Sequence, residues 1–345
     1  MNNTSAIILA AGNGKRMKTD LPKALCEVLF KPMLDHVVQS LIQSEIKDIC
    51  IVIGKSGDLI KQHVAKCKLY EQCKVTFAVQ KEQLGTGHAV MQSGDFIKSK
   101  SENDIIILCG DAPFIDKETI INSYNYHKDN FCDATVITAT LNNPTGYGRI
   151  VRQNNNVYSI CEHKDTDEKS VLIKEVNSGA FWFKADGLFD ALRKIENNNS
   201  QNEYYLTDTV EILNKLNKKV GGFIAATNDI VLGANDRKTL MQLNEIANNR
   251  NIEKHLSNGV EIIIKDGIII GDDVTIENGS IILPNTIIIK GSKIGKNCKI
   301  GPSSYIENSI ISDNSKVIAS YVCDYNGSEN IDEDFLGPFD SVVEY

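Results

Sequence analysis

The chain has 345 residues, of which 42% are hydrophobic, so it is long enough for two domains that each bury a core. Its formal net charge of -8 argues against a general nucleic-acid-binding protein, because a polyanionic partner requires a basic surface. Nine cysteines without a Cys-x-x-Cys pair indicate reduced thiols in a cytoplasmic protein rather than a disulfide framework or a zinc site. No apolar stretch approaches the ~20 residues of a membrane span, so we expect no membrane insertion.

A glycine-containing loop follows the first apolar run, residues 5–8. Glycine lets backbone N–H groups approach a ligand closely, and nearby cations supply charge, so the loop predicts a binding site for a phosphate group. It has neither the third glycine of a dinucleotide-binding loop nor the Gly-Lys-Ser/Thr of a P-loop. A surface turn with solvated lysines is the alternative. The candidate residues are Leu9, Ala10, Ala11, Gly12, Gly14, Lys15, Arg16 and Lys23.

Strand-like runs alternate with helical patterns through the first two thirds of the chain. Residues 49–53, 75–79, 105–108 and 134–140 are rich in β-branched side chains, and residues 34–42 carry apolar side chains at helical spacing. This alternation predicts a mostly parallel α/β sheet of the Rossmann-like kind, with helices on its faces. Since the opening loop and Gly110-Asp111 each follow a predicted strand, we expect both in one crevice at the carboxyl ends of the strands.

The last third of the chain repeats every six residues. Such spacing predicts a parallel β-helix, whereas ordinary hairpins would alternate every two residues. Ile311 and Val317 continue the series one residue out of step. Before the repeats, apolar residues from Leu240 to Ala247 predict a connecting helix with residues 248–251 as its polar end. The repeated positions are Ile264, Ile270, Ile276, Ile282, Ile288, Ile294, Ile300 and Ile306.

Several short motifs are spread along most of the chain. They are the opening loop with Pro22-Lys23 and then residues 80–89, 110–111, 144–150, 162–165, 177–179, 203–208 and 233–235. In these motifs the chain resembles the bacterial N-acetylglucosamine-1-phosphate uridyltransferases, whose longer members also carry a glucosamine-1-phosphate acetyltransferase domain. The resemblance implies a nucleotidyltransferase domain at 1–236, a helical linker at 237–258 and a shortened left-handed parallel β-helix at 259–345.

The resemblance implies the transfer of UMP from UTP to N-acetylglucosamine 1-phosphate, with pyrophosphate as leaving group. Two polyanions must then meet, so catalysis consists of charge neutralisation and in-line positioning. Arg16 and Lys23 would be the catalytic cations, with Lys15 a weaker candidate. Asp111 and Asn235 would hold one Mg²⁺ through hard oxygen atoms.

The remaining site residues are also assigned by resemblance. Gln80 would read the uracil edge through its amide, and Gly85 would let the backbone approach the ring. Cys109 stands where many relatives have a hydroxyl-bearing residue, which puts one polar contact in doubt. The nucleotide-binding residues would be Leu9, Ala10, Ala11, Gly12, Gly14, Lys23, Gln80, Gly85, Thr86 and Asp111, and the sugar-binding residues Cys109, Gly110, Gly148, Glu162 and Asn177.

The end of the chain and its assembly carry two further expectations. The acetyltransferase site of long relatives lies beyond a point equivalent to Tyr345, so we expect no acetyltransferase activity. We expect a homotrimer through the β-helix. Two alternatives remain open: a uridylyl- or thymidylyltransferase for another sugar 1-phosphate in surface glycan synthesis, and a catalytically silent subunit that binds a sugar nucleotide.

Overall fold

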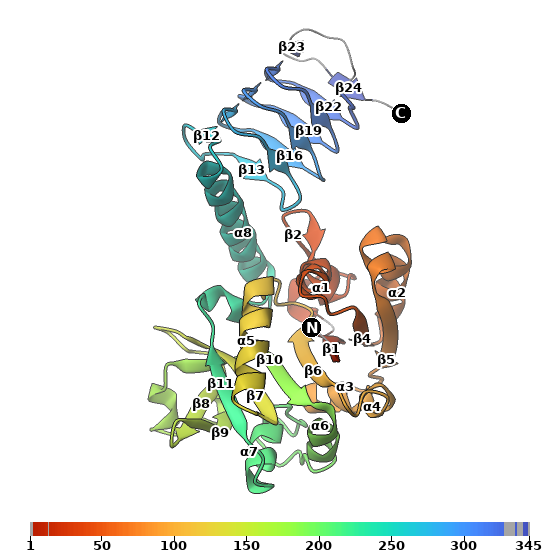
Figure 1. Ribbon diagram of the computed structural model, residues 1–345, viewed down its shortest axis with the longest axis vertical. Helices are drawn as coiled ribbons and strands as arrows, with labels where there is room; N and C mark the ends of the chain where they lie inside the picture. The colour runs from red at the N-terminus through yellow and green to blue at the C-terminus, as the bar shows by residue number, and fades with distance from the viewer. Residues whose placement is uncertain (1–2, 13, 328–334, 337–340, 344–345) are drawn as a thin grey trace. The chain divides into compact units, whose positions relative to one another are not determined.

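The structure is a computed structural model that describes residues 3–12, 14–327, 335–336 and 341–343 (Figure 1). The chain forms two compact units, Met1–Cys26 with Pro32–Thr239 and Glu27–Lys31 with Leu240–Tyr345. None of the helices in the described residues combines the length and the apolar character that a bilayer-spanning segment needs.

The first unit is built on a nine-stranded sheet with the order β11-β7-β10-β6-β1-β4-β5, and β8 and β9 extend it from β10. Along this order neighbours run parallel except at β10, which is antiparallel to β6 and β7, and the added strands β8 and β9 are antiparallel to their neighbours. The predicted mostly parallel α/β sheet is therefore confirmed. The strands are β1 (Thr4–Ala10), β4 (Asp48–Ile53), β5 (Lys74–Val79), β6 (Asp104–Cys109), β7 (Ala134–Thr140), β8 (Arg149–Gln153), β9 (Asn156–Cys161), β10 (Glu175–Lys184) and β11 (Val220–Ile224).

Helices cover both faces of this sheet, because successive side chains of a strand point to opposite faces. Ala6 and Ile8 of β1 share a core with α1, α2 and α5, whereas Ile7 shares a core with α3, α4, α6 and α7. The helices are α1 (Met33–Gln43), α2 (Gly57–Lys66), α3 (Thr86–Met91), α4 (Gly94–Lys98), α5 (Lys117–Asp129), α6 (Ala185–Leu192) and α7 (Asp208–Lys215). Short 3₁₀ helices connect them: η1 (Lys15–Met17), η2 (Lys23–Leu25), η3 (Lys68–Gln72), η4 (His163–Asp165), η5 (Ser170–Leu172) and η6 (Asn228–Val231).

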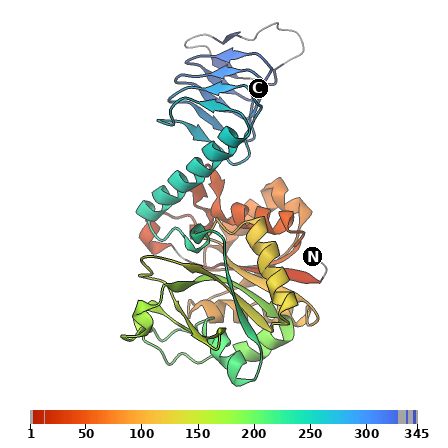
Figure 2. The same ribbon diagram turned by 60° about the vertical axis from the view of Figure 1, so that its left-hand side comes forward.

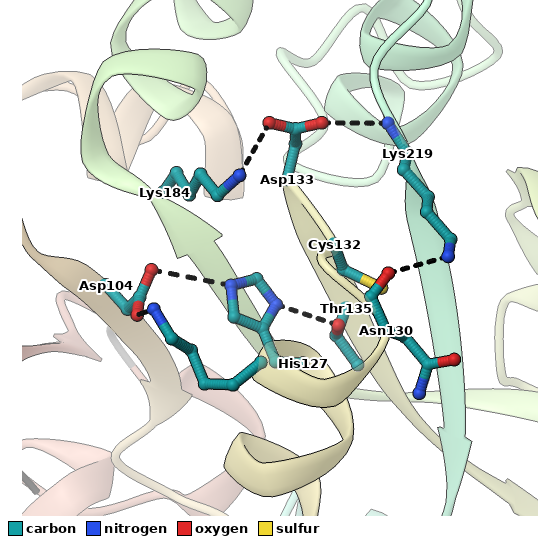
Figure 3. A network of polar contacts seen from close by, with 9 residues as sticks. Asp104, His127, Asn130, Cys132, Asp133, Thr135, Lys184 and Lys219 are labelled. Atoms are coloured by element: carbon teal, nitrogen blue, oxygen red, sulfur yellow. Dashed lines mark hydrogen bonds and ion pairs between the residues drawn. The ribbon is translucent and has the colours of Figure 1, made fainter.

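A polar network ties α5 to the amino ends of β6 and β7 (Figure 3). The buried ring of His127 makes a 2.9 Å hydrogen bond with Thr135 Oγ1 and lies 3.5 Å from Asp104 Oδ1. Burial acts to raise the pKa of Asp104, but contacts with His127 and Lys128 outweigh it and hold that pKa below its usual value. Nearby, Asp133 accepts hydrogen bonds from Lys184 and Lys219. The network therefore lies at the edge of the sheet opposite the carboxyl ends of the parallel strands.

The second unit is a parallel β-helix preceded by the long helix α8 (Arg237–Ser257), whose first three residues belong to the first unit. From β12 to β22 every third strand pairs in parallel, and β23 and β24 pair with β21 and β22, so the coils stack as three sheets (Figure 2). A hairpin of β2 (Glu27–Val28) and β3 (Lys31–Pro32) accompanies them. The coil strands are β12 (Glu261–Ile262), β13 (Ile269–Ile270), β14 (Thr275–Ile276), β15 (Ile281–Ile282), β16 (Ile287–Ile289), β17 (Lys293–Ile294), β18 (Lys299–Ile300), β19 (Tyr305–Glu307), β20 (Ile310–Ile311), β21 (Lys316–Val317), β22 (Tyr321–Cys323), β23 (Phe335–Leu336) and β24 (Ser341–Val343).

The six-residue series fills the interior of the β-helix from Ile270 to Val317, where each member is at most 6% exposed. The sequence also assigns Ile264 to this series, and that assignment is wrong, since its side chain is 49% exposed and lies outside the interior. Ile262 pairs with Ile282 instead, so the first coil is out of phase with the repeat. A second buried series of small residues was not predicted. The hydroxyl groups of its serines donate to backbone carbonyls, as Ser292 does to Ile289 at 2.6 Å, whereas Thr286 Oγ1 has no hydrogen-bond partner among the described residues. The series includes Ser280, Thr286, Ser292, Ser304, Ser309, Ser315 and Ser320.

The asparagine-rich stretch at 248–251 lies inside α8 and does not end it, contrary to the prediction. Asn248 accepts a 3.0 Å hydrogen bond from the backbone N–H of Ile270 and donates one of 2.7 Å to Ile268 O. Asn251 donates to Ile270 O at 2.9 Å. These amides are retained within a helix because they satisfy the backbone of the first coil, which no preceding coil covers.

Candidate active site

A pocket of about 290 Å³ opens at the carboxyl ends of β1 and β6. The opening loop and Asp111 both line it, as expected for loops that follow neighbouring parallel strands. The pocket is also lined by four residues that were not predicted individually, Ala24, Gln83, Ala89 and Glu203. The predicted residues in its lining are Leu9, Ala10, Ala11, Gly12, Lys23, Gln80, Gly85, Thr86, Cys109 and Asp111.

Lys23 is the centre of a charged cluster at this pocket. Its ammonium group forms an ion pair with Asp111 and donates a 2.9 Å hydrogen bond to Oδ1 of Asn235. Arg16 Nη2 donates to the same Asn235 oxygen at 3.4 Å. The four residues predicted for catalysis and metal binding therefore lie together, with two oxygen ligands directed at one cation.

The loop reaches this cluster through a close approach at Gly14. Its φ of +53° is left-handed, and a Cβ there would lie 3.2 Å from the Cβ of Lys23. Glycine thus permits both the turn and the packing against η2. Gly14 does not line the pocket itself, and the side chain of Lys15 lies outside the described part of the structure.

The segment from Gln80 to Thr86 forms one wall of the pocket. The buried amide of Gln80 donates through Nε2 to Gly85 O at 3.0 Å, so its donor group is used to hold the 80–86 segment in place. Gly85 also lies close to another segment: a Cβ there would be 2.5 Å from Tyr204 O, so the absence of a side chain makes room for that backbone. Thr86 Oγ1 accepts from the backbone N–H of Leu206 at 3.1 Å.

The residues predicted for sugar binding gather beside the pocket. Asn177 N donates to Gly148 O at 2.9 Å, and a Cβ on Gly148 would lie 3.5 Å from the carboxylate of Glu162. Thr207 Oγ1 donates to Glu162 at 3.0 Å. Burial raises the pKa of Glu162 above its usual value, although the hydrogen bond from Thr207 opposes it. Gly148, Glu162 and Asn177 thus form one cluster and do not line the pocket of the opening loop.

Cys109 and Gly110 connect this cluster to the pocket. Cys109 Sγ lies 3.7 Å from Gly179 O, two residues after Asn177. Burial and the charge of Asp111 raise the pKa of the Cys109 thiol to about 12, so it is protonated near neutral pH. Gly110 N donates to Leu9 O at 2.9 Å, which holds the ends of β1 and β6 side by side.

Two residues with structural roles at the site were missed. Gln83 donates to Ala11 O at 2.6 Å and so fixes the opening loop, and its position inside the 80–89 motif was the available signal. Arg149 is 1% exposed, donates to Tyr147 O and lies 3.5 Å from His163 Nδ1. A charged residue in a strand gives no sequence signal of such burial, because arginine is rarely buried to this extent.

Comparison with known proteins agrees with both units. A family model described as "Nucleotidyl transferase" matches residues 5–230, and one described as "Bacterial transferase hexapeptide (six repeats)" matches residues 267–308. A solved structure of UDP-glucose pyrophosphorylase complexed with UDP-glucose superposes with a TM-score of 0.60 at 15% identity, covering 73% of this chain and 99% of that one. At that identity the likeness concerns the fold.

Curated relatives are similar over longer stretches. A protein named Bifunctional protein GlmU from Clostridium acetobutylicum is 40% identical over 335 residues, which are 97% of this chain and 71% of the relative. The protein of that name from Clostridium botulinum is 42% identical over 258 residues, 75% of this chain, and the chain spans 55% of its length. The chain belongs to the nucleotidyl transferase family and is similar to the GlmU proteins along nearly its whole length.

Proposed function

We propose that this protein transfers UMP from UTP to a sugar 1-phosphate, with N-acetylglucosamine 1-phosphate as the preferred acceptor, and releases pyrophosphate. The observation that carries the proposal is the cluster at Lys23. One ammonium group, one guanidinium group and two oxygen ligands meet at the edge of a pocket walled by a glycine-containing loop. This arrangement suits a triphosphate accompanied by a divalent cation.

The proposed reaction requires no covalent intermediate on the protein. The attacking phosphate oxygen is already ionised, so the chain's residues have to hold two anions in line and neutralise the charge that develops on them. Lys23 and Arg16 do this through side chains that Asn235 orients. We assign no general base, because the nucleophile has no proton to lose at neutral pH.

We propose Mg²⁺ as the cofactor, held by Asp111 and Asn235. Their oxygen atoms already converge on a cation, the Lys23 ammonium, and a carboxylate with an amide oxygen is a donor set that Mg²⁺ accepts while keeping several waters. When bound, the ion supplies charge neutralisation at the phosphates. Lys23 would then exchange its contact with Asp111 for a contact with the nucleotide.

We assign the base to the wall formed by Gln80, Gly85 and Thr86. With Gln80 Nε2 engaged by Gly85 O, its Oε1 is the atom that would accept the ring N–H of a uracil or thymine. We assign the sugar to Gly148, Glu162 and Asn177, where the carboxylate would accept from hydroxyl groups. Cys109 supplies a weak donor between the two subsites.

The test is pyrophosphate release by the purified protein with Mg²⁺, from UTP and from dTTP, each with a panel of sugar 1-phosphates. We expect the highest kcat/KM with UTP and N-acetylglucosamine 1-phosphate. A higher value for glucose or galactose 1-phosphate, or for dTTP, would replace that substrate assignment. Absence of turnover on every pair, together with measurable UTP binding, would instead identify a silent subunit.

Two variants and one control make the test specific to the site. Asp111→Asn removes a proposed metal ligand, and Lys23→Ala removes the central cation. Asp133→Asn is the matched control, since this carboxylate contacts Lys184 at the opposite edge of the sheet (Figure 3). If Asp111→Asn and Lys23→Ala retain turnover within a few-fold of Asp133→Asn, the site assignment fails.

We also propose a homotrimer through the β-helix. Tyr305 and Tyr321 stack with ring centroids 5.0 Å apart on one of its faces, and Tyr321 and Ile310 are 46% and 42% exposed. Ile310 lies on a neighbouring sheet of the β-helix, so exposed apolar side chains occur on two of its faces, which favours association with further copies. Gel filtration with light scattering tests this, and a monomer at micromolar concentration would refute it. The proposal includes no acetyl transfer, which an assay with acetyl-CoA and glucosamine 1-phosphate checks separately.

A further inference from the structure

A second cluster of chemically active side chains lies in the first unit, outside the pocket of the opening loop. Asp35 of α1, His63 of α2 and Cys67, the residue that ends α2, place one ligand-type atom each within 4.8 Å of one another. Among the described residues this is the one group of three or more histidine, cysteine and acidic side chains that meets so closely. None of the three belongs to the site proposed for nucleotidyl transfer.

The geometry of the cluster is set by helix spacing and by one buried carboxylate. His63 and Cys67 are four residues apart, which puts them on one face of α2. Asp35 is 5% exposed, and its Oδ1 and Oδ2 lie 2.8 Å and 3.0 Å from His63 Nε2. Cys67 Sγ lies 3.9 Å from Asp35 Oδ2. Oxygen, nitrogen and sulfur thus converge from two helices.

Tyr70 supports this arrangement from the buried side. Its hydroxyl donates to Asp35 Oδ1 at 2.7 Å, and its ring packs edge-on against that of His63 with centroids 6.0 Å apart. A hydrogen-bonded carboxylate and an oriented imidazole are the features that outer partners supply in metal sites. The open side is accessible, because the His63 side chain is 25% exposed and Cys67 is half-buried.

We propose that Asp35, His63 and Cys67 bind one divalent ion of the zinc class, with water in the fourth position. A thiol is a poor hydrogen-bond donor and adds little to a network at 3.9 Å, whereas a thiolate is a strong ligand for such an ion. One carboxylate and one thiolate balance its two positive charges, and the Cys67 proton leaves to solvent as the sulfur–metal bond forms. Sulfur and imidazole disfavour Mg²⁺, so the two metal sites differ in selectivity.

The ion would join α1 to the end of α2. Apolar residues of α1 share a core with Ala24 and Leu25, the residues that follow Lys23 in η2. Metal binding would therefore reduce the motion of α1, the helix against which the segment after Lys23 packs. Because an ion that binds only the folded state stabilises it, we expect the melting temperature to rise when Zn²⁺ is added.

The test is a titration of the metal-free protein with Co²⁺ in excess Mg²⁺, which saturates the oxygen-ligand site. We expect one equivalent to bind, with a thiolate-to-cobalt charge-transfer band. The Cys67→Ser variant should lose the band, and His63→Gln should bind more than about 10-fold more weakly, the least that loss of even an outer partner costs. Cys73→Ser is the matched control and should keep the band. A band that survives in Cys67→Ser overturns the proposal.

A second measurement uses the unmodified protein and does not depend on the folding of any variant. Cysteine alkylation is mapped by peptide mass spectrometry with and without one equivalent of Zn²⁺. We expect Zn²⁺ to protect Cys67 and to leave Cys73 unchanged as the internal reference, since both are half-buried. Equal alkylation of Cys67 in the two samples refutes the site. Both readouts are independent of catalysis, so they stand or fall separately from the proposed function.

Discussion

The side-chain nitrogen of Lys23 donates a 2.9 Å hydrogen bond to Oδ1 of Asn235, although 212 positions separate the two residues in the chain. The same nitrogen pairs with Asp111. A single ammonium group therefore joins the segment after β1, the end of β6 and the last loop before α8.

Loss of the Lys23 ammonium should reduce turnover more than it reduces stability. For Lys23→Ala we expect kcat to fall at least about 100-fold, as when one donor to developing charge is removed from a preorganised site. Pyrophosphate release measures this effect. Lys184→Ala removes an ammonium that contacts Asp133 at 3.2 Å on the opposite edge and should leave kcat unchanged. Similar rates for the two variants would contradict the role of Lys23.

Removal of the Asn235 amide should appear as a changed metal requirement. In Asn235→Ala we expect the Mg²⁺ concentration for half-maximal rate to rise at least about 10-fold. Loss of a residue that merely hydrogen-bonds a metal ligand already weakens metal affinity by about that factor. Saturating Mg²⁺ should restore part of the rate. Asn198→Ala changes an exposed asparagine bonded to Glu196 and serves as the control. An unchanged Mg²⁺ dependence in Asn235→Ala would exclude this residue as a ligand.

A methyl group at Gly85 should be more costly than one at Gly146. Both have positive φ, +115° and +90°, so both alanine variants strain the backbone. Only at Gly85 would the new Cβ lie 2.5 Å from Tyr204 O, while Gly146 has open space. Urea unfolding should show a loss of about 1 kcal/mol for Gly146→Ala and about 3 kcal/mol or more for Gly85→Ala. Equal losses would mean that the contact with Tyr204 is unimportant.

Asp208 should make the protein less stable as the pH rises. Burial, with the charges of Glu162, Glu211 and Asp165, raises the pKa of Asp208 to about 6. The folded state then holds a proton that the unfolded state has released between about pH 4 and 6, so stability falls as pH rises through this window.

The variant Asp208→Asn removes this titration. We expect it to be more stable than the parent at pH 7 by about 1–3 kcal/mol and equally stable near pH 4. Denaturant unfolding at both pH values measures the difference. A stability difference that does not change with pH would contradict the raised pKa.

Two isoleucines of the six-residue series should differ sharply in their contribution to stability. Ile288 is fully buried between coils, and Ile288→Ala should cost about 2–5 kcal/mol. Ile264 is 49% exposed, and Ile264→Ala should change stability by no more than about 0.5 kcal/mol. Thermal and denaturant unfolding of the two variants compare them directly. A large loss at Ile264 would place it in the interior after all.

The periodic parts of this fold can be predicted from the sequence because burial imposes a repeat on it. The strand predicted at 134–140 matches β7, and the six-residue series predicts the interior from Ile270 onward. Periodicity alone does not predict burial at Ile264. This residue fits the six-residue spacing, but it belongs to the first coil, which has no preceding coil to cover it. The buried serines have no apolar signal at all.

The candidate site was predictable only in part, for a related reason. The spacing of Gly12, Gly14 and Lys23 indicates an anion site, since loop chemistry is local. The pairing of Asp111 with Asn235 came from the family resemblance, because no local pattern links residues so far apart. The close approach of Tyr204 to Gly85 could not be predicted, since the backbone that fills this space comes from a distant segment. Asp35, His63 and Cys67 gave no signal, as their encounter depends on how α1 and α2 pack.

The amides of Asn248 and Asn251 also have a consequence for solubility. The first coil of a solenoid presents backbone N–H and C=O groups that could recruit a strand from another molecule and start a fibre. Here α8 occupies the backbone groups of Ile268 and Ile270 with side-chain amides. A helix that bonds through asparagine cannot itself be extended as a sheet, so it blocks edge-to-edge pairing at β13, the first strand of one of the three sheets.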